Sequence, residues 1–397
     1  MRLPVYRWWM VAALAVTATT GYGVLTYAFA VLLVPMQEAL GSDRTAVTGA
    51  QTVSLLAAAL AAVPVGRWLD RRGGRALMVG CSILATVLVL AWSQVHSLLA
   101  LYAVSFGLGI ASAGVLYEAA FAVVVTWFRD PRRGTAMLAI TIAGGFASTI
   151  FMPLTAVLVE SYGWRQALVV LAVIYGVLTV PLHLLVRRPP DFAPQRREAR
   201  KNTASAVRDP GYWLIAGVFV AQGVGIFVVG VHLVAYLREL GHAPTVAANV
   251  AGLLGVMSVT GRVVTTFAAR RYGLTVVAVV FALQAVGLAL LPVVGNALAP
   301  AIACVLAIGL GFGVSTIARP TLLADRYGVA GYATLAGLLA AILTVTKALA
   351  PLGAAWLRTV AGTYTPVMAI SAAGGILGAA GLLALRSARA ATRTPVA

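Results

Sequence analysis

Four ionisable side chains lie within otherwise apolar stretches, and they are the residues of this sequence best placed to do chemistry. Three are the cations Arg262, Arg319 and Lys347, and the fourth is the acid Glu118. A charge near the middle of a bilayer costs about 2.5–3.5 kcal/mol on insertion scales, so such a charge is retained mainly where it faces a wet cavity or a partner. The sequence therefore predicts a buried site with net positive charge, which suits an anion.

Arginine and lysine offer a carboxylate different chemistry. Arginine presents a planar, permanently charged fork that can bind both carboxylate oxygens, whereas lysine is a compact point charge on a flexible stem. The chain has 27 arginines and two lysines, and the other lysine, Lys201, lies in a polar stretch. We therefore expect Arg262 to orient a substrate carboxylate and Lys347 to neutralise it or a second one. The alternative for Lys347 is that its ammonium reaches the membrane surface.

Glu118 and Arg319 leave two interpretations open. They could pair with each other in a structural or gating role, because intramembrane charges usually have partners. Alternatively, Glu118 could carry a coupling proton. Neutral side chains that can hydrogen-bond an oxyanion complete the predicted substrate site: Tyr27, Tyr117, His232 and Ser258, with Gln222 as a further candidate.

The elements that hold these residues are predicted to be membrane-spanning helices. The chain is 61% hydrophobic and 10% charged, with a mean hydropathy of +0.95, whereas soluble domains are about 25% charged. Segments of about 20 residues cross a hydrocarbon core of about 30 Å as helices. The sequence predicts an all-α integral membrane protein with twelve such helices, over 8–36, 45–66, 76–95, 98–127, 134–159, 165–186, 212–237, 246–269, 274–293, 298–324, 332–358 and 365–386.

The formal net charge of +18 is distributed unevenly over the predicted loops. If the N-terminus is cytoplasmic, 22 Lys and Arg fall in the tails and the connections on the cytoplasmic side. Only four fall on the other side, namely Arg44, Arg165, Arg238 and Arg358. This asymmetry is the positive-inside pattern of a cytoplasmic membrane. It predicts that both termini are cytoplasmic, and it accounts for the basic charge without nucleic-acid binding.

The chain divides into two halves around one stretch rich in proline and charge. We predict an N-terminal six-helix bundle over 1–186, a flexible cytoplasmic linker over 187–211 and a C-terminal six-helix bundle over 212–397. The halves echo each other, because Gly-Leu-Gly at 107–109 precedes Glu118 and the same triplet at 309–311 precedes Arg319. Tandem halves with a substrate site at their interface are a recurrent design of membrane carriers.

The loop between the second and third predicted helices carries the most specific motif. Residues 66–75 read GRWLDRRGGR, with Gly66, Asp70, Arg71, Gly73 and Arg75 at its marked positions. This motif resembles the signature of the major facilitator superfamily. The resemblance implies two pseudo-symmetric six-helix bundles around a central cavity, and alternating access of a substrate to the two sides. We expect Asp70, Arg71 and Arg75 to stabilise the outward-open state.

A second segment resembles one branch of that superfamily. Residues 127–136, WFRDPRRGTA, continuing to Ala-Gly-Gly at 143–145, are similar to the entry of helix five in the monocarboxylate porter and oxalate/formate antiporter branch. Members of the branch hold substrate carboxylates with an arginine in helix eight, and the oxalate/formate exchanger also uses a lysine in helix eleven. Arg262 and Lys347 fall in those two helices. Ser258 stands where the animal proton-coupled members have an aspartate, which favours exchange or a different proton carrier.

Other function classes fit the residues less well. An enzyme would need a nucleophile, a metal cluster or paired acids, and the chain offers four histidines in no metal-binding spacing. Cys81 and Cys304 are expected to be packing residues, so we expect neither a cofactor nor a metal. A drug/proton antiporter is the main alternative, although residues 142–148 lack the proline of the usual antiporter motif. The expected partners are a small carboxylate-type anion, protons and the lipid bilayer, and the expected state is a monomer.

Overall fold

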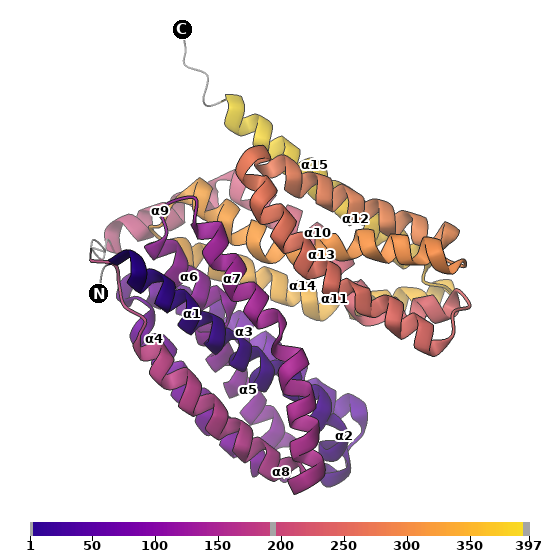
Figure 1. The fold of residues 1–397 in the computed structure, drawn as a ribbon, viewed down its shortest axis with the longest axis horizontal. Coiled ribbons are helices and arrows are strands. Elements are labelled where there is room, and N and C mark those ends of the chain that lie inside the picture. The colour runs from indigo at the N-terminus through magenta and orange to yellow at the C-terminus, as the bar shows by residue number, and fades with distance from the viewer. Residues whose placement is uncertain (1–2, 191–195, 392–397) are drawn as a thin grey trace. The chain divides into compact units, whose positions relative to one another are not determined.

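The computed structural model describes residues 3–190 and 196–391, and every regular element within these ranges is a helix (Figure 1). The elements are α1 (Leu3–Tyr22), the π-helix η1 (Gly23–Tyr27), α2 (Ala28–Leu40), α3 (Arg44–Arg72), α4 (Gly74–Ser93), α5 (Leu98–Val115), α6 (Tyr117–Trp127), α7 (Arg133–Gly145), α8 (Ala147–Leu184), α9 (Arg196–Arg208), α10 (Pro210–Glu239), α11 (Pro244–Tyr272), α12 (Leu274–Val294), α13 (Leu298–Tyr327), α14 (Tyr332–Ala361) and α15 (Thr365–Ala391).

These helices account for the twelve predicted membrane crossings. The described residues contain eleven continuous stretches that are long and apolar enough to span a bilayer. One of them, Arg133–Leu184, is 52 residues long and turns back at Gly163, whose φ of +77° is strained for any residue with a side chain. This stretch therefore crosses twice, and the predicted twelve-helix architecture is confirmed.

The first and fourth predicted helices are interrupted in the middle, and the fifth is divided at Phe146 between α7 and α8. The first is continuous from Leu3 to Leu40 but includes the five-residue π-helical segment η1. The fourth was expected to run unbroken over 98–127, and it is divided by Leu116, whose ψ of −165° is extended. Hydropathy could not reveal either feature, because the residues on both sides of each interruption are equally apolar.

The stretch expected to be a flexible linker contains helix α9. Its residues include several arginines, alanines, a lysine and a glutamate, which are good helix formers. Asp209 follows α9 and begins α10 by accepting a hydrogen bond from Gly211 N at 2.8 Å, with Pro210 at the first helical position. A short polar helix thus leads directly into the second set of spans.

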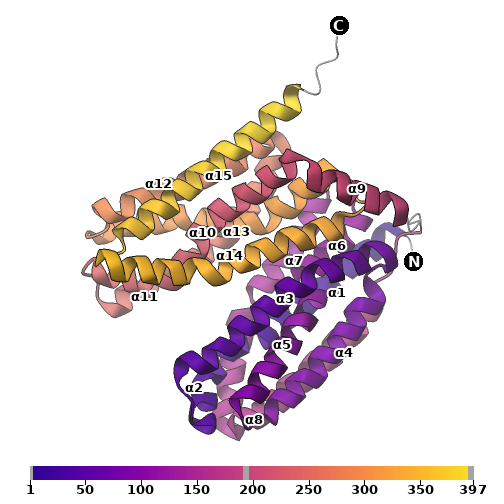
Figure 2. The same cartoon turned by 180° about the vertical axis from the view of Figure 1, so that it is seen from behind.

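The chain forms two compact units. Unit 1 comprises residues 1–204 and 323–344, and unit 2 comprises 205–322 and 345–397. In unit 1, α3 packs along α5, α4 along α8, and α1 along α7 and α8. In unit 2, α15 packs along both α10 and α12, as Figure 2 shows from behind. The sequence division at 187–211 stays a prediction about the two halves.

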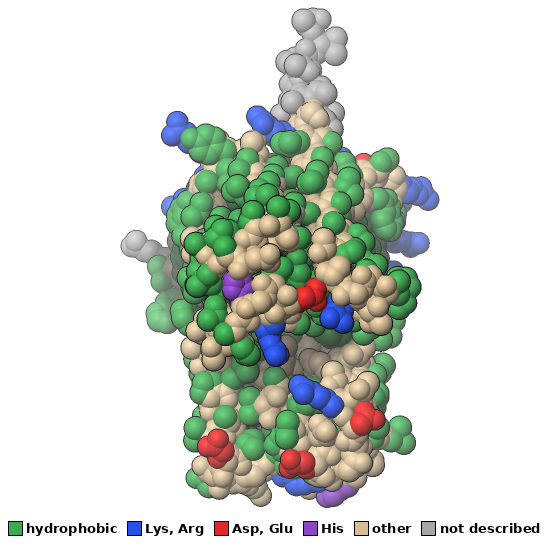
Figure 3. Space-filling model, turned by 90° about the vertical axis from the view of Figure 1, so that its right-hand side faces the viewer, with side chains coloured by type: hydrophobic (Ala, Val, Ile, Leu, Met, Phe, Trp, Pro, Cys, Tyr) green, Lys and Arg blue, Asp and Glu red, His purple; other side chains and the backbone are tan. Residues whose placement is uncertain are grey.

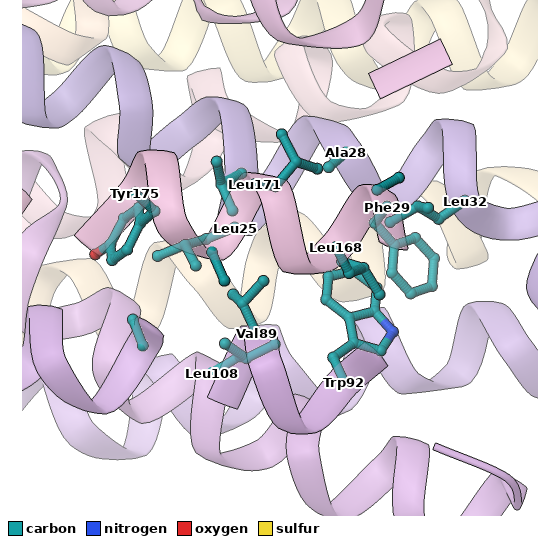
Figure 4. Close-up of a cluster of buried hydrophobic side chains, with 14 of the residues drawn as sticks. Leu25, Ala28, Phe29, Leu32, Val89, Trp92, Leu108, Leu168, Leu171 and Tyr175 are labelled. Atoms are coloured by element: carbon teal, nitrogen blue, oxygen red, sulfur yellow. The ribbon is translucent and has the colours of Figure 1, made fainter. Parts of the chain in front are cut away.

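The core of unit 1 lies where η1 and α2 pack against α4, α5 and α8 (Figure 4). Trp92 of α4 stacks on Phe29 of α2 with ring centroids 5.9 Å apart, and its indole N–H points to the sulfur of Met36 at 3.1 Å. Leu168 and Leu171 of α8 complete the cluster. These contacts anchor the chain directly after η1.

The two units repeat the same helices at a constant spacing. The helices α3, α4 and α5 begin at residues 44, 74 and 98, and α11, α12 and α13 begin 200 residues later, at 244, 274 and 298. The packing repeats as well. A Cβ on Gly109 would lie 2.1 Å from Ser54 O, and a Cβ on Gly309 would lie 3.3 Å from the Cα of Leu254. The helices thus repeat with an offset of 200 residues, and the two Gly-Leu-Gly triplets, which are 202 residues apart, lie in corresponding helices but two residues out of register.

The outer surfaces of both units are apolar. Exposed large hydrophobic side chains recur along the spans, including Val157 and Val177 of α8, Val293 of α12 and Leu377 of α15. In the face drawn in Figure 3, charged side chains are scattered among hydrophobic and uncharged ones. Such surfaces suit lipid contact, because a soluble protein rarely exposes large contiguous apolar patches.

Candidate functional site

Arg262 lies within the span α11, ten residues before the end of that helix at Tyr272, or about 15 Å along the helix axis. Its terminal N–H donates to Ser258 Oγ, one turn earlier, at 3.3 Å. The facing helix α13 has a glycine here, and a Cβ on Gly313 would lie 2.7 Å from Arg262 Nε. The sequence thus leaves space for the guanidinium between two helices, with Ser258 orienting it.

A buried network of neutral polar groups lies beside this arginine in unit 2. Gln222 of α10 donates from its amide to Gln284 Oε1 of α12 at 3.0 Å, and Ser315 Oγ of α13 donates to Gln222 Oε1 at 2.7 Å. Both glutamines are at most 1% exposed. The network links α10, α12 and α13. Its contacts on α13 fall within residues 311–315, and the same stretch packs on Ser258 and Arg262.

Of this network, Gln222 was predicted from the sequence, whereas Gln284 and Ser315 were not. An amide in an apolar helix is the available signal for Gln284, but it is weaker than that of a charged side chain. Ser315 carried no comparable signal, since small hydroxyl residues are common in membrane helices. Their grouping depends on which faces of three helices meet.

Lys347 lies in α14, within the part that belongs to unit 2, and its side chain is exposed. Pro351 follows one turn later and has no backbone N–H, so the carbonyl of Lys347 cannot receive the usual helical hydrogen bond from that position. Both Arg262 and Lys347 therefore belong to unit 2. Their joint action on a substrate stays a prediction.

His232 of α10 has both ring nitrogens engaged by protein groups. Nε2 lies 3.0 Å from Pro351 O and Nδ1 lies 3.1 Å from Tyr364 Oη. A carbonyl only accepts, so Nε2 carries the proton and the tyrosine hydroxyl donates to Nδ1. His232 thus links α10 to the proline turn of α14, four residues beyond Lys347, and a direct substrate contact stays a prediction.

In unit 1, three interruptions of regular helix meet around Tyr117. The ring of Tyr117 packs against Tyr22, next to η1, with centroids 4.5 Å apart, and its hydroxyl donates to Thr141 O of α7 at 3.5 Å. A Cβ on Gly144, where α7 ends, would lie 2.3 Å from that hydroxyl. Irregular backbone at membrane depth is tolerated where it is buried in protein or lines a wet cavity.

Glu118 lies in the first turn of α6, directly after the break at Leu116. A carboxylate at a helix N-terminus is stabilised by the helix dipole. Sequence analysis expected Glu118 in the middle of a continuous helix, and the break places it at a helix start instead. Tyr27 ends η1 and is partly buried. Arg319 belongs to unit 2, so its pairing with Glu118 stays a prediction.

The motif at 66–75 contacts the start of α14 within unit 1. The two carboxylate oxygens of Asp70 accept from Ala333 N at 3.0 Å, from Thr334 N at 2.9 Å and from Thr334 Oγ1 at 2.6 Å. These donors belong to the first turn of α14, whose N–H groups have no partner within the helix. A Cβ on Gly66 would lie 2.2 Å from Ala333 O, so glycine permits the approach.

The remaining marked positions of the motif surround this contact. Gly73 ends α3 with a φ of +72°, a value that favours glycine. The side chains of Arg71 and Arg75 are exposed. Near the same place, the last turn of α13 is linked to the start of α7 by an ion pair between Asp325 and Arg133, at 2.9 Å.

Comparison with known proteins follows this geometry. The sequence model of the Major Facilitator Superfamily matches residues 11–351. Over 333 residues the chain is 27% identical to the oxalate:formate antiporter of Oxalobacter formigenes, which covers 81% of this chain and 78% of that protein. Over 184 residues it is 32% identical to an MFS-type efflux pump of Mycolicibacterium smegmatis, covering 46% of this chain and 42% of the pump. The crystal structure of the fucose:proton symporter of Escherichia coli aligns with a TM-score of 0.74 and 13% identity, over 94% of this chain and 98% of that one.

Proposed function

Because this chain belongs to the major facilitator superfamily, we propose that it carries a small organic anion, a mono- or dicarboxylate, across the cytoplasmic membrane by alternating access. As a member of this superfamily it is a secondary transporter, not an enzyme. The proposed halves are residues 1–186 and 212–397, joined by 187–211. We propose that it acts as an exchanger or a proton-coupled symporter, as a monomer with both termini in the cytoplasm.

The observation that carries the proposal is the setting of Arg262. An always-charged guanidinium is kept within a membrane span, oriented by Ser258 at 3.3 Å and given room by Gly313. A planar fork in this position suits the two oxygens of a carboxylate. A cation kept at membrane depth marks a functional site, because its burial is costly.

Lys347 supplies the second proposed charge. Its helix is linked to α10 through His232 and Pro351, so we propose that His232 acts by positioning the turn that follows Lys347. Tyr27 and Tyr117 are proposed to hydrogen-bond the substrate from unit 1. Glu118 and Arg319 are proposed to serve coupling or gating, either as a pair or with Glu118 as the proton carrier.

The similarity to the oxalate:formate antiporter supports carboxylates as the substrate class and exchange as the mode. A second candidate is drug/proton antiport or another kind of export. The similarity to the efflux pump of M. smegmatis favours it. The two candidates differ in the charge of the substrate, because a cavity with net positive charge repels cationic drugs.

A binding panel on the purified protein tests the proposal. Thermal shifts are measured with formate, lactate, oxalate and malonate, and with a cationic dye of the type that efflux pumps export. We expect at least one carboxylate to raise the unfolding temperature of wild type. We expect its apparent affinity to be at least tenfold lower in Arg262→Ala and in Lys347→Ala. Arg270→Ala, eight residues later on α11, and Lys201→Ala are the matched controls.

The opposite binding pattern would favour the alternative function, drug/proton antiport or another kind of export. Binding of the cationic dye that neither Arg262→Ala nor Lys347→Ala changes would contradict anion transport and favour export. Glu118→Gln then separates the two roles of that acid. Loss of proton-driven uptake with intact exchange indicates a proton carrier, whereas loss of folded protein indicates a structural pair.

A further inference from the structure

A cavity with charged residues in its lining lies in unit 1, whereas Arg262 belongs to unit 2. It has a volume of about 200 Å³ and lies between the end of α6, the start of α4, the residues after α8 and the turn between α13 and α14. A water molecule occupies about 30 Å³ in the liquid, so the cavity has room for a group of several heavy atoms. None of the residues proposed to contact the transported substrate lines it.

Three arginines line this cavity, and they come from two separate segments. Arg129 follows α6, and Arg187 and Arg188 follow α8. The neighbouring acid Asp130 is paired with Arg7 at 3.2 Å. The lining also includes Asp70, whose oxygens already accept three hydrogen bonds from α14. The lining therefore carries excess positive charge.

The segment that carries two of these arginines is anchored. The carbonyl of Arg187 accepts from the indole N–H of Trp127 at 2.8 Å, and its guanidinium lies 5.5 Å from the ring centroid of Tyr6. The hydroxyl of Tyr6 in turn donates to Leu185 O. The cation is thus held by protein contacts before any ligand arrives, which lowers the entropy lost on binding.

Gly73 makes room for the third arginine. A Cβ at this position would lie 2.5 Å from Arg188 Nε, so a glycine lets the arginine side chain cross the turn between α3 and α4. Gly73 and Gly74 also line the cavity; Gly74 is the first residue of α4, and the first N–H groups of a helix favour an anion. Leu69 and Val123 supply an apolar part of the lining.

We propose that this cavity binds a phosphate group through Arg129, Arg187 and Arg188. The guanidinium fork matches phosphate oxygens, and three forks around one cavity suit a group with several oxygens. Two sources offer that chemistry, namely the headgroup of an anionic phospholipid and free inorganic phosphate. The inference is independent of the transported substrate.

Thermal unfolding of the full-length protein in detergent tests the inference. The probes are short-chain phosphatidylglycerol, short-chain phosphatidylcholine at the same concentration, and inorganic phosphate against chloride at equal ionic strength. We expect the unfolding temperature of wild type to rise by roughly 2–4 °C with one of the two anionic probes. Arg129→Gln/Arg188→Gln is expected to lose this rise. Arg132→Gln, an exposed arginine of the same loop that does not line the cavity, is expected to keep it.

The two anionic probes distinguish a lipid headgroup from free phosphate as the source of the bound group. A rise with phosphatidylglycerol alone identifies a lipid headgroup, and an equal rise with inorganic phosphate identifies a soluble anion. The proposal is overturned if the glutamine variant responds as wild type does, or if neither anionic probe has an effect. If that variant does not fold, Arg129→Lys/Arg188→Lys keeps the charge and removes the forks; we expect less than half of the wild-type rise, and a full rise overturns the proposal.

Discussion

At the scale of single residues, the buried amides of unit 2 are as informative as the charges. Gln222 accepts from Ser315 and donates to Gln284, while Gln284 Nε2 is buried with no acceptor among the described residues. A buried polar group stabilises a fold only while its partner is present. The network therefore makes each glutamine dependent on the other.

This dependence predicts how single and double substitutions of the glutamines change the free energy of unfolding. Gln222→Leu should lower the free energy of unfolding by about 1–3 kcal/mol, because it leaves Gln284 and Ser315 without their partner. Gln222→Leu/Gln284→Leu should recover at least half of that loss, since both amides are then gone. The measurement is unfolding in micelles followed by tryptophan fluorescence, with the exposed Gln166→Leu as control, expected within ±0.5 kcal/mol. A double variant less stable than the single one would refute the pairing.

Residues that carry charge could be found from the sequence, whereas their surroundings could not. Arg262 and Lys347 were identified because a cation is conspicuous among apolar neighbours. The pairing of Arg262 with Ser258 follows from helical spacing of four residues. The space provided by Gly313 depends on how α13 lies against α11, and no local pattern encodes that contact.

At the scale of elements, the interruptions of unit 1 are the features that hydropathy did not reveal. The π-helical turn η1 contains one residue more than an α-helical turn, and its wider turn accommodates that residue with little rotation of α1 relative to α2. Val24 and Leu25 within it are buried in the core of unit 1, and so are Ala28 and Leu32 beyond it. The extra residue is therefore accommodated within the turn, next to side chains that belong to the core.

Deleting Thr26 tests whether the extra residue is needed for folding. Without it, η1 can close into regular α-helix and leave α1 and α2 in nearly their present orientation, so the expected loss of unfolding free energy is less than about 2 kcal/mol. Thr26→Ala keeps the residue count and should cost less than about 1 kcal/mol. A loss above about 3 kcal/mol in the deletion variant, in the same fluorescence assay, would show that the π turn itself is needed to seat the core residues of α2.

At the scale of the whole molecule, twelve crossings and the repeat of 200 residues were predictable in outline. Helix length and apolar runs yielded the spans, and the Gly-Leu-Gly triplets indicated the repeat. The contribution of residues 323–344 to unit 1 was not predictable. It depends on Asp70 and Gly66 meeting the start of α14, a contact between segments about 260 residues apart.

An even number of crossings places both ends of the chain on one side, and the charge distribution predicts that this side is the cytoplasm. Single cysteines in a Cys81→Ser/Cys304→Ser background test this prediction. A membrane-impermeant maleimide added to intact cells should label Thr45→Cys, at the start of α3, and Asn296→Cys, between α12 and α13, because both are predicted to face away from the cytoplasm. It should label Ser205→Cys, in α9, only after the membrane is opened. Labelling of Ser205→Cys in intact cells would reverse the predicted orientation.

The contact between Asp70 and α14 can form only late in biosynthesis. Asp70 and Ala333 are 263 residues apart in the chain. At about 5–20 residues per second, the ribosome needs roughly 13–50 s to make the intervening chain. During that interval the carboxylate has left the ribosome and its final donors do not yet exist. The first six spans must therefore persist in the membrane as an unfinished intermediate, whose completion waits for the eleventh.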